Sequence, residues 1–182
     1  DGAGVDIIHS IIKNNVSSAD LVEIEIGSNA TASISYSMIP NGLNAINNDG
    51  TLTWGDGNID VNPMFVDAAN GDYHLSDTSP CISAGTASIT IDGVIYTAPT
   101  TDITGIPNSR PSPAGTIPDM GAYENSNGVA SYSGDTYYVS ASSNYGNGSS
   151  TYPFPAIQQG IDASSSGDTV SVAAGTYHES ID

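Results

Sequence analysis

The residues best placed to do chemistry surround Trp54, the single tryptophan, in a loop rich in glycine, aspartate and asparagine (residues 47–62). An accessible indole stacks on the apolar face of a sugar ring, so Trp54 is the candidate glycan-binding residue. Three aspartates of the same loop, Asp49, Asp56 and Asp60, carry the hard oxygen ligands that Ca²⁺ prefers. The alternative is that Trp54 covers the flank of a hydrophobic core while the aspartates only form turns.

Groups that could transfer protons or attack a substrate are few and scattered. Cys81 lies between Pro80 and Ile82, a context typical of a buried, inert thiol. Arg110 follows a serine and precedes a proline, and we expect it to be a structural clamp on an acidic surface. The histidines are far apart in the sequence and lack metal-ligand spacing; they are His9, His74 and His178. The sequence therefore names no catalytic residue and favours a protein that is not an enzyme.

The charge balance excludes two classes of partner. Two basic residues, Lys and Arg together, stand against 20 acidic ones, for a net charge of −18. This charge repels nucleic-acid phosphates and anionic membrane surfaces. No apolar run approaches the length of a membrane span, so membrane insertion is not expected. Divalent cations, Ca²⁺ above all, are natural counterions for such a chain, and a polysaccharide is a compatible partner.

An internal repeat indicates how the first part of the chain is organised. Residues 7–15 (IIHSIIKNN) align with residues 34–42 (ISYSMIPNG) after a shift of 27 positions, which places Ile7 on Ile34 and Ile12 on Ile39. A period of this size corresponds to one coil of a solenoid, in which each coil stacks its apolar residues on the next. The repeat predicts parallel strands whose isoleucines face inward.

The rest of the chain divides by composition. Residues 87–96 (ASITIDGVIY) predict a hairpin with Asp92-Gly93 as its turn. Residues 97–118 are rich in proline, threonine and serine and predict an extended strap. Residues 136–182 predict a strand, a short helix and a second strand. We therefore expect coils and a closing segment over 1–124, a linker over 125–135 and a separate capping unit over 136–182.

Two stretches carry a resemblance to a known family. The run YYVSASSNYGNGSSTYPFPAIQQGIDASSSGDTVSVAAGTYHESI resembles the N-terminal start of pectate-lyase-like right-handed parallel β-helix proteins. The segment NIDVNPMFVDAANGDYHLSDTSPCISAG, with PDMGAYE after it, resembles the end of bacterial surface-associated β-helix proteins. The resemblance implies an all-β fold, a right-handed parallel β-solenoid with a short capping helix near the C-terminus. The chain would hold the end of one β-helix followed by the start of another.

This order implies two unpaired strand edges and, from them, a function. The edges would pair either within one chain or head to tail between copies. The residues expected at these edges are Val5, Ile7, Ile12, Thr169, Val170 and Val172. We expect an extracellular or cell-surface microbial protein that serves as a structural subunit of a surface fibre or filament. The alternatives are a glycan-binding or adhesive module and a fragment of a polysaccharide lyase or hydrolase.

Overall fold

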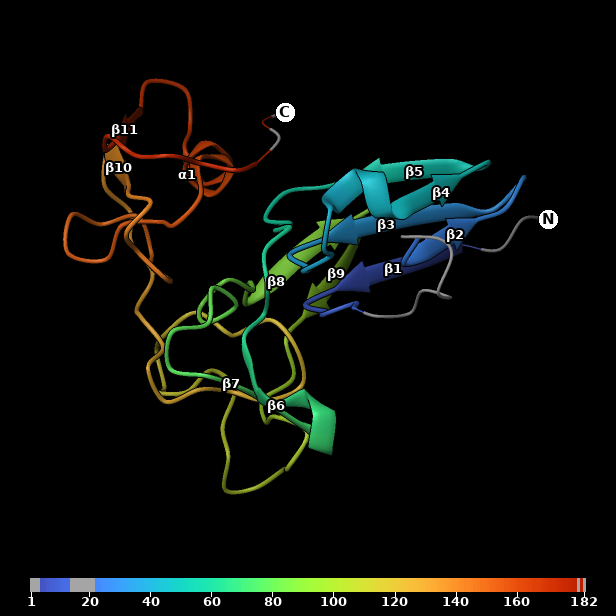
Figure 1. The fold of residues 1–182 in the computed structure, drawn as a ribbon, viewed down its shortest axis with the longest axis horizontal. Helices are drawn as coiled ribbons and strands as arrows, with labels where there is room; N and C mark the ends of the chain where they lie inside the picture. Colours follow the sequence, from blue (N-terminus) through green and yellow to red (C-terminus); the bar gives the residue numbers. More distant parts are fainter. Residues whose placement is uncertain (1–3, 14–21, 180, 182) are drawn as a thin grey trace.

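The computed structural model describes residues 4–13, 22–179 and 181 of the 182-residue chain (Figure 1). Its elements, in chain order, are β1 (Gly4–Ile8), β2 (Ile24–Ile26), β3 (Thr31–Ser35), the 3-10 helix η1 (Gly42–Ala45), β4 (Ile46–Asn48), β5 (Thr51–Trp54), β6 (Phe65–Asp67), the 3-10 helix η2 (Ala68–Asn70), β7 (Asp72–Leu75), β8 (Ser88–Ile91), β9 (Val94–Thr97), β10 (Thr136–Val139), α1 (Ile157–Ala163) and β11 (Thr169–Val172). Figure 1 shows β1 to β5 on one side of the molecule and β10, α1 and β11 set apart on the other.

The largest sheet is parallel and has the order β1-β3-β5. Ile7 lies opposite Ile34, and Ile34 lies opposite Trp54. The offset between Ile7 and Ile34 is the 27 residues of the sequence repeat. Ile34, Ile39 and Ala45 are fully buried and form one core cluster, against which the flanking isoleucines and Trp54 pack. Burial of β-branched side chains on the inner face therefore sets the register of this sheet.

The expected right-handed parallel β-helix is not supported, and the fold class inferred from it was wrong. The described strands form five small separate sheets, and two of these, β6-β7 and β8-β9, are antiparallel. The parallel ladder ends after Ile59, whose bridge to Met38 is the last of that series. Pro63 follows, and Met64 has a φ of 54°, so the chain turns into the β6-β7 hairpin instead of starting another coil.

A second core cluster lies below the parallel sheet and joins it to the later segments. It contains Met38, Ile59, Leu75, Cys81, Ile82 and Met120. Cys81 is fully buried, so the prediction of a buried thiol is confirmed, and burial raises the pKa of the thiol to about 12. The hairpin prediction is also confirmed, because β8 and β9 pair around Asp92 and Gly93, which have positive φ angles of 49° and 81°.

The C-terminal unit, residues 136–179, contains the expected strand, helix and strand. β10 and β11 are parallel, and α1 packs over them through Gly160. The segment expected to be a linker is partly docked, since Val129 is buried and its N–H donates to Ser83 Oγ at 2.8 Å. The division into domains stays a prediction.

Candidate functional site

A cleft lies between the C-terminal unit and the turn that follows β5. Its cavity volume is about 290 Å³. Trp54 and Asp60 line one wall, while Gln159, Tyr177 and Glu179 line the other. A hydrogen bond joins the C-terminal unit to the β5 turn, because Asp162 Oδ2 accepts from Gly57 N–H at 2.7 Å. Within α1, Asp162 Oδ1 accepts a hydrogen bond from Gln158 Nε2 at 2.6 Å. Docking of α1 on the β5 turn therefore creates the cleft.

Trp54 ends β5 and has two roles in the geometry. It packs against the cluster of Ile34, Ile39 and Ala45, as the core-covering interpretation predicts. It is only half-buried, and it lines the cleft. A rigid aromatic surface is thus presented at no further conformational cost, because the indole is already fixed by the core behind it.

Two carboxylates border the cleft and differ in their surroundings. Glu179 is fixed, because its Oε1 accepts a hydrogen bond from Ile157 N–H at 2.7 Å and its Oε2 accepts one from Gln158 N–H at 2.9 Å. Asp60 is half-buried, and its carboxylate accepts a hydrogen bond from its own backbone N–H. Burial, with a smaller contribution from the charge of Glu179, raises the pKa of Asp60. Asp60 is therefore the carboxylate in the cleft that is open to a ligand.

The opposite wall adds a second aromatic ring and an unsatisfied acceptor. The Tyr177 hydroxyl donates to Ala173 O at 2.9 Å and accepts from Ala141 N–H at 3.0 Å, so the ring is held in place. Gln159 Oε1 is buried and has no hydrogen-bond partner among the described residues. A buried acceptor without a donor costs free energy. The Gln159 side chain would have to turn before a ligand hydroxyl in the cleft could reach this oxygen.

The expected calcium residues do not converge. Asp49 is exposed in the turn between β4 and β5, Asp56 is exposed in the turn after β5, and Asp60 lines the cleft. Within the ranges 4–13, 22–179 and 181, no group of three or more His, Cys, Asp or Glu side chains is arranged to hold a metal ion. The geometry gives no support to a calcium site built from these three aspartates.

The three histidines occupy unrelated places. His9 lies beside the second core, and its Nε2 accepts a hydrogen bond from Thr86 N–H at 2.7 Å. Burial, with a smaller contribution from the charge of Arg110, lowers the pKa of His9 to about 4. His74 is exposed, pairs with Asp72 at 2.6 Å and lies against the ring of Tyr123. His178 is exposed at the rim of the cleft.

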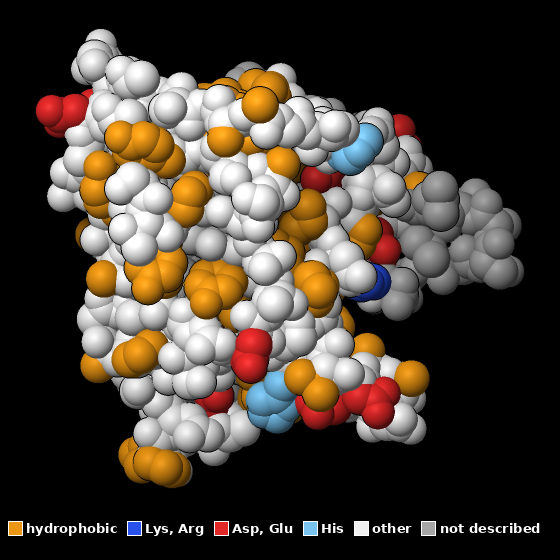
Figure 2. Space-filling model, turned by 60° about the vertical axis from the view of Figure 1, so that its left-hand side comes forward, with side chains coloured by type: hydrophobic (Ala, Val, Ile, Leu, Met, Phe, Trp, Pro, Cys, Tyr) orange, Lys and Arg blue, Asp and Glu red, His pale blue; other side chains and the backbone are white. Residues whose placement is uncertain are grey.

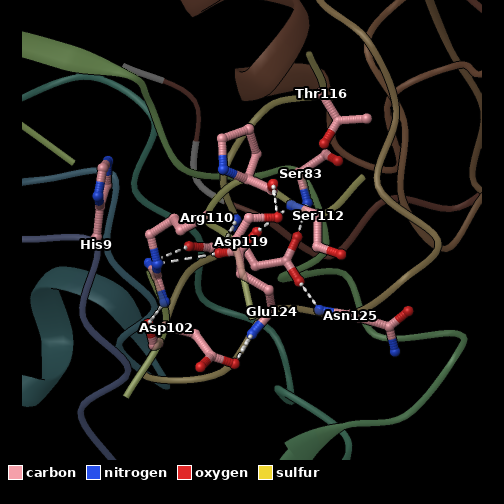
Figure 3. Close-up of polar contacts among 12 residues, drawn as sticks. His9, Ser83, Asp102, Arg110, Ser112, Thr116, Asp119, Glu124 and Asn125 are labelled. Atoms are coloured by element: carbon pink, nitrogen blue, oxygen red, sulfur yellow. Dashed lines mark hydrogen bonds and ion pairs between the residues drawn. The ribbon is translucent and has the colours of Figure 1, made fainter. Parts of the chain in front are cut away.

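Arg110 is the centre of a buried polar network (Figure 3). Its Nε lies 3.2 Å from Glu124 Oε1, and the two side chains are 5% and 1% exposed. Its guanidinium also donates to the carbonyl oxygens of Asp119 at 3.2 Å and Gly121 at 2.7 Å. The clamp expected for Arg110 is thus present, although it lies inside the protein and not on an acidic surface.

Asp119 completes the Arg110 network. Its Oδ1 accepts a hydrogen bond from Ser83 N–H at 2.7 Å, and its Oδ2 accepts one from Asn125 N–H at 2.6 Å. Burial and the neighbouring Glu124 raise the pKa of Asp119 to about 7. Because backbone groups from the chain around it occupy both oxygens, the network is a structural device that holds the strap to the second core.

The strand edges expected to mediate assembly lie in two different sheets. Val5 is 53% exposed on β1, while Ile7 and Ile12 pack at the border of the Ile34 cluster. Tyr96 of β9 donates to Asp6 Oδ2 of β1 at 2.7 Å, so the hairpin lies beside this edge. Thr169, Val170 and Val172 belong to β11, whose strand partner is β10. In the described part of the chain, β1 and β11 are not paired with each other.

Sequence reasoning found Trp54 and Asp60 but missed the second wall of the cleft. Gln158, Gln159, Tyr177 and Glu179 are more than 90 residues away from Trp54 in the sequence. They reach the cleft only because α1 docks through Asp162. No local sequence pattern predicts such a docking. The one feature of the sequence that could have indicated this wall is the pair of Tyr177 and Glu179, an aromatic and a carboxylate that follow a short helix.

Comparisons with protein-family models, with curated proteins and with solved structures found no match. The small mixed sheets contradict the expected β-helical surface protein, and no match to a known protein supports an adhesin, a filament, an extracellular location or calcium binding. Among the residues that the structure describes, no helix is long and apolar enough to cross a membrane.

Proposed function

We propose that this protein is a non-enzymatic carbohydrate-binding module and that the cleft between the β5 turn and the C-terminal unit is its binding site. The observation that carries the proposal is that Trp54, Tyr177 and the Asp60 carboxylate line one concave site. Ligand sites are typically concave, mainly apolar and furnished with a few well-placed polar groups. Here the apolar part is aromatic on both walls, with Trp54 on one and Tyr177 on the other.

The polar groups match the chemistry of sugars. A sugar presents hydroxyl donors around the rim of an apolar ring face. Asp60 lines the cleft and provides a carboxylate acceptor for such a hydroxyl. Hydrogen bonds to a carboxylate are about twice as strong as those between neutral groups. Stacking on Trp54 would orient the ring, and a hydrogen bond to the Asp60 carboxylate would fix its register.

The affinity should be modest. A ligand of disaccharide size gains about 0.3 kcal/mol per non-hydrogen atom, which places the ceiling at a Kd of about 10 µM. The proposal is tested by titrating neutral oligosaccharides into the full chain in a calorimeter. We expect Kd values between about 10 µM and 1 mM and one site per chain.

Variants distinguish the cleft from the rest of the surface. Trp54→Ala should weaken binding about tenfold or more, and Trp54→Leu should do the same while it keeps apolar packing against the Ile34 cluster. Tyr152→Ala is the matched control, because Tyr152 is an aromatic of the C-terminal unit that is 46% exposed and lies outside the cleft. Unchanged binding in a folded Trp54→Leu variant, or an equal loss in Tyr152→Ala, would refute the proposal.

Head-to-tail association of copies is a second proposal, supported by the position of β1 and β11 at the ends of their sheets. Thr169 N–H and Ala173 N–H donate inward to the β10 side at 2.9 Å, so the N–H of Val172 should point outward. Val172→Pro should therefore block this outer edge without breaking the β10-β11 ladder. Sedimentation at 0.5 M NaCl, where the net charge of −18 is screened, should show oligomers of the native chain but not of the variant.

A further inference from the structure

In the described part of the chain, the cleft is lined by acidic side chains and by no lysine or arginine. Asp60 and Glu179 line it, and His178 at its rim is the only other ionisable side chain there apart from the tyrosine hydroxyl. None of the described residues that line the cleft is a lysine or an arginine. A ligand that enters the cleft therefore meets two carboxylates and no fixed cation.

Neither basic side chain of the protein is placed to balance the negative charge of the cleft. The two basic residues of the chain are Lys13 and Arg110. Lys13 Nζ donates to Asn62 Oδ1 at 2.9 Å, and Arg110 is 8% exposed and paired with Glu124. On the face drawn in Figure 2, acidic side chains occur at several places while blue is confined to one spot. Neither basic side chain lines the cleft, so a ligand carboxylate there would go without a partner.

Asp60 determines which charged groups of a ligand the cleft attracts and which it repels. Its carboxylate is half-buried, so charges brought near it are less well screened than on an open surface. A sugar carboxylate or sulfate beside Asp60 is repelled, a hydroxyl is accepted as a donor, and a protonated sugar amine is attracted. Glu179 reinforces the same preference, although its oxygens are already engaged by Ile157 N–H and Gln158 N–H.

We infer that the cleft selects neutral and amine-bearing saccharides and rejects uronic-acid and sulfated ones, and that the Asp60 carboxylate is the group that pairs with a sugar ammonium. This inference rests on the proposed carbohydrate-binding function. It also separates the protein from polyuronate chemistry, in which the substrate carboxylates must be neutralised by cations.

The test is a titration of matched oligomers at pH 6 and low ionic strength. Tetramers of glucose, glucosamine, N-acetylglucosamine and galacturonic acid would each be titrated into the full chain by calorimetry. We expect the glucosamine tetramer to bind about tenfold more tightly than the glucose tetramer, and the galacturonic acid tetramer to show no binding. The tenfold preference should shrink in 0.5 M NaCl.

Asp60→Asn should abolish the preference for the amine, because the amide keeps an acceptor but loses the charge. Asp49→Asn is the control, since it makes the same change in net charge at an exposed turn outside the cleft. Thermal midpoints would establish that both variants are folded. Equal affinity for the glucose and glucosamine tetramers, or binding of the galacturonic acid tetramer, overturns this inference while carbohydrate binding stands. If no tetramer binds, the proposed function fails and the inference with it.

Discussion

The parallel sheet and the strap that follows the β8-β9 hairpin are stabilised by opposite means. In the sheet, Ile34 and Ile39 are fully buried and make apolar contacts on the inner face. Where the strap (residues 97–118) docks, the buried centre is the ion pair of Arg110 with Glu124 from the segment that follows, surrounded by backbone donors and acceptors. Burial of apolar surface is additive and tolerant of small changes, whereas a buried polar network depends on every member.

This difference predicts how each region fails. Removal of one methyl group from an apolar cluster leaves a cavity whose cost depends on how far its neighbours relax. Removal of one member of a buried ion pair leaves an uncompensated buried charge. The free-energy cost of that charge is larger than the net stabilisation that the intact pair provided. Single substitutions in the strap should therefore be more damaging than substitutions of similar size in the sheet.

The largest effect should come from Arg110→Met. The variant leaves Glu124 buried without its partner and removes the donors to the carbonyl oxygens of Asp119 and Gly121. We expect the free energy of unfolding to fall by about 3–5 kcal/mol, measured by urea denaturation. Lys13→Met is the control, because Lys13 makes one exposed hydrogen bond, and it should cost less than about 1 kcal/mol. Similar losses in the two variants would contradict a structural role for the network.

The apolar counterpart is Ile34→Ala. Ile34 is 0% exposed at the centre of the β1-β3-β5 sheet, and its truncation should cost about 3 kcal/mol. Val5→Ala in β1 is the matched control, since Val5 is 53% exposed and should tolerate the change within about 0.5 kcal/mol. A loss in Ile34→Ala larger than that in Arg110→Met would reverse the ranking of the two regions.

His9 links the parallel sheet to the segment that follows the strap, and its titration makes the stability of the folded chain depend on pH. Its carbonyl oxygen accepts from Gly121 N–H at 2.8 Å, and its ring accepts from Thr86 N–H. Because the pKa is about 4 in the folded state and 6.5 in the unfolded state, the unfolded chain binds more protons between these values. Stability is therefore lost as the pH falls from about 6.5 to about 4.

His9→Asn should remove this pH dependence, and asparagine tolerates the positive φ of 54° at this position. Relative to the variant, the native chain should lose at most about 3 kcal/mol between pH 6.5 and pH 4, since one pKa unit corresponds to about 1.4 kcal/mol. Urea midpoints across this range provide the measurement. A constant difference between the two proteins would show that His9 titrates alike in both states.

The smallest effect concerns the C-terminal unit, where apolar packing is tight. Alanine is usually favoured over glycine inside a helix by about 1 kcal/mol. In Gly160→Ala, however, the new methyl group would lie 2.9 Å from Val139 Cγ2 and 2.9 Å from Val170 Cγ1. We expect a net loss of about 1 kcal/mol, while Gly27→Ala, which meets nothing within 4 Å, should be neutral. Stabilisation by Gly160→Ala would indicate that α1 packs loosely on β10 and β11.

The two regions also differ in how far their structure could be predicted from the sequence. The isoleucine repeat predicted the register of β1 on β3, and the Asp92-Gly93 turn predicted the β8-β9 hairpin, because both depend on local spacing. The continuous parallel β-helix was wrong, since the turn at Pro63 and Met64 redirects the chain into an antiparallel pair.

The network and the cleft lay beyond sequence reasoning for a physical reason. The contacts of Arg110 with Glu124 and of Asp119 with Ser83 have no period, because the strap that carries them has no regular structure. Likewise, Trp54 and Tyr177 come to line the same cleft only through the docking of α1 on the β5 turn. Residues that become neighbours through tertiary docking leave no signature in the spacing of the chain.

The fluorescence of Trp54 tests carbohydrate binding in the cleft most directly, because Trp54 is the only tryptophan in the chain and it lines the cleft. The full chain would be titrated with neutral and amine-bearing oligosaccharides while the emission spectrum is recorded. If a sugar ring stacks on Trp54, the emission should shift to shorter wavelength and saturate with the Kd found by calorimetry, because the ring displaces water from the indole. An emission spectrum that stays unchanged up to about 10 mM oligosaccharide, well above the expected Kd range, would contradict binding in the cleft.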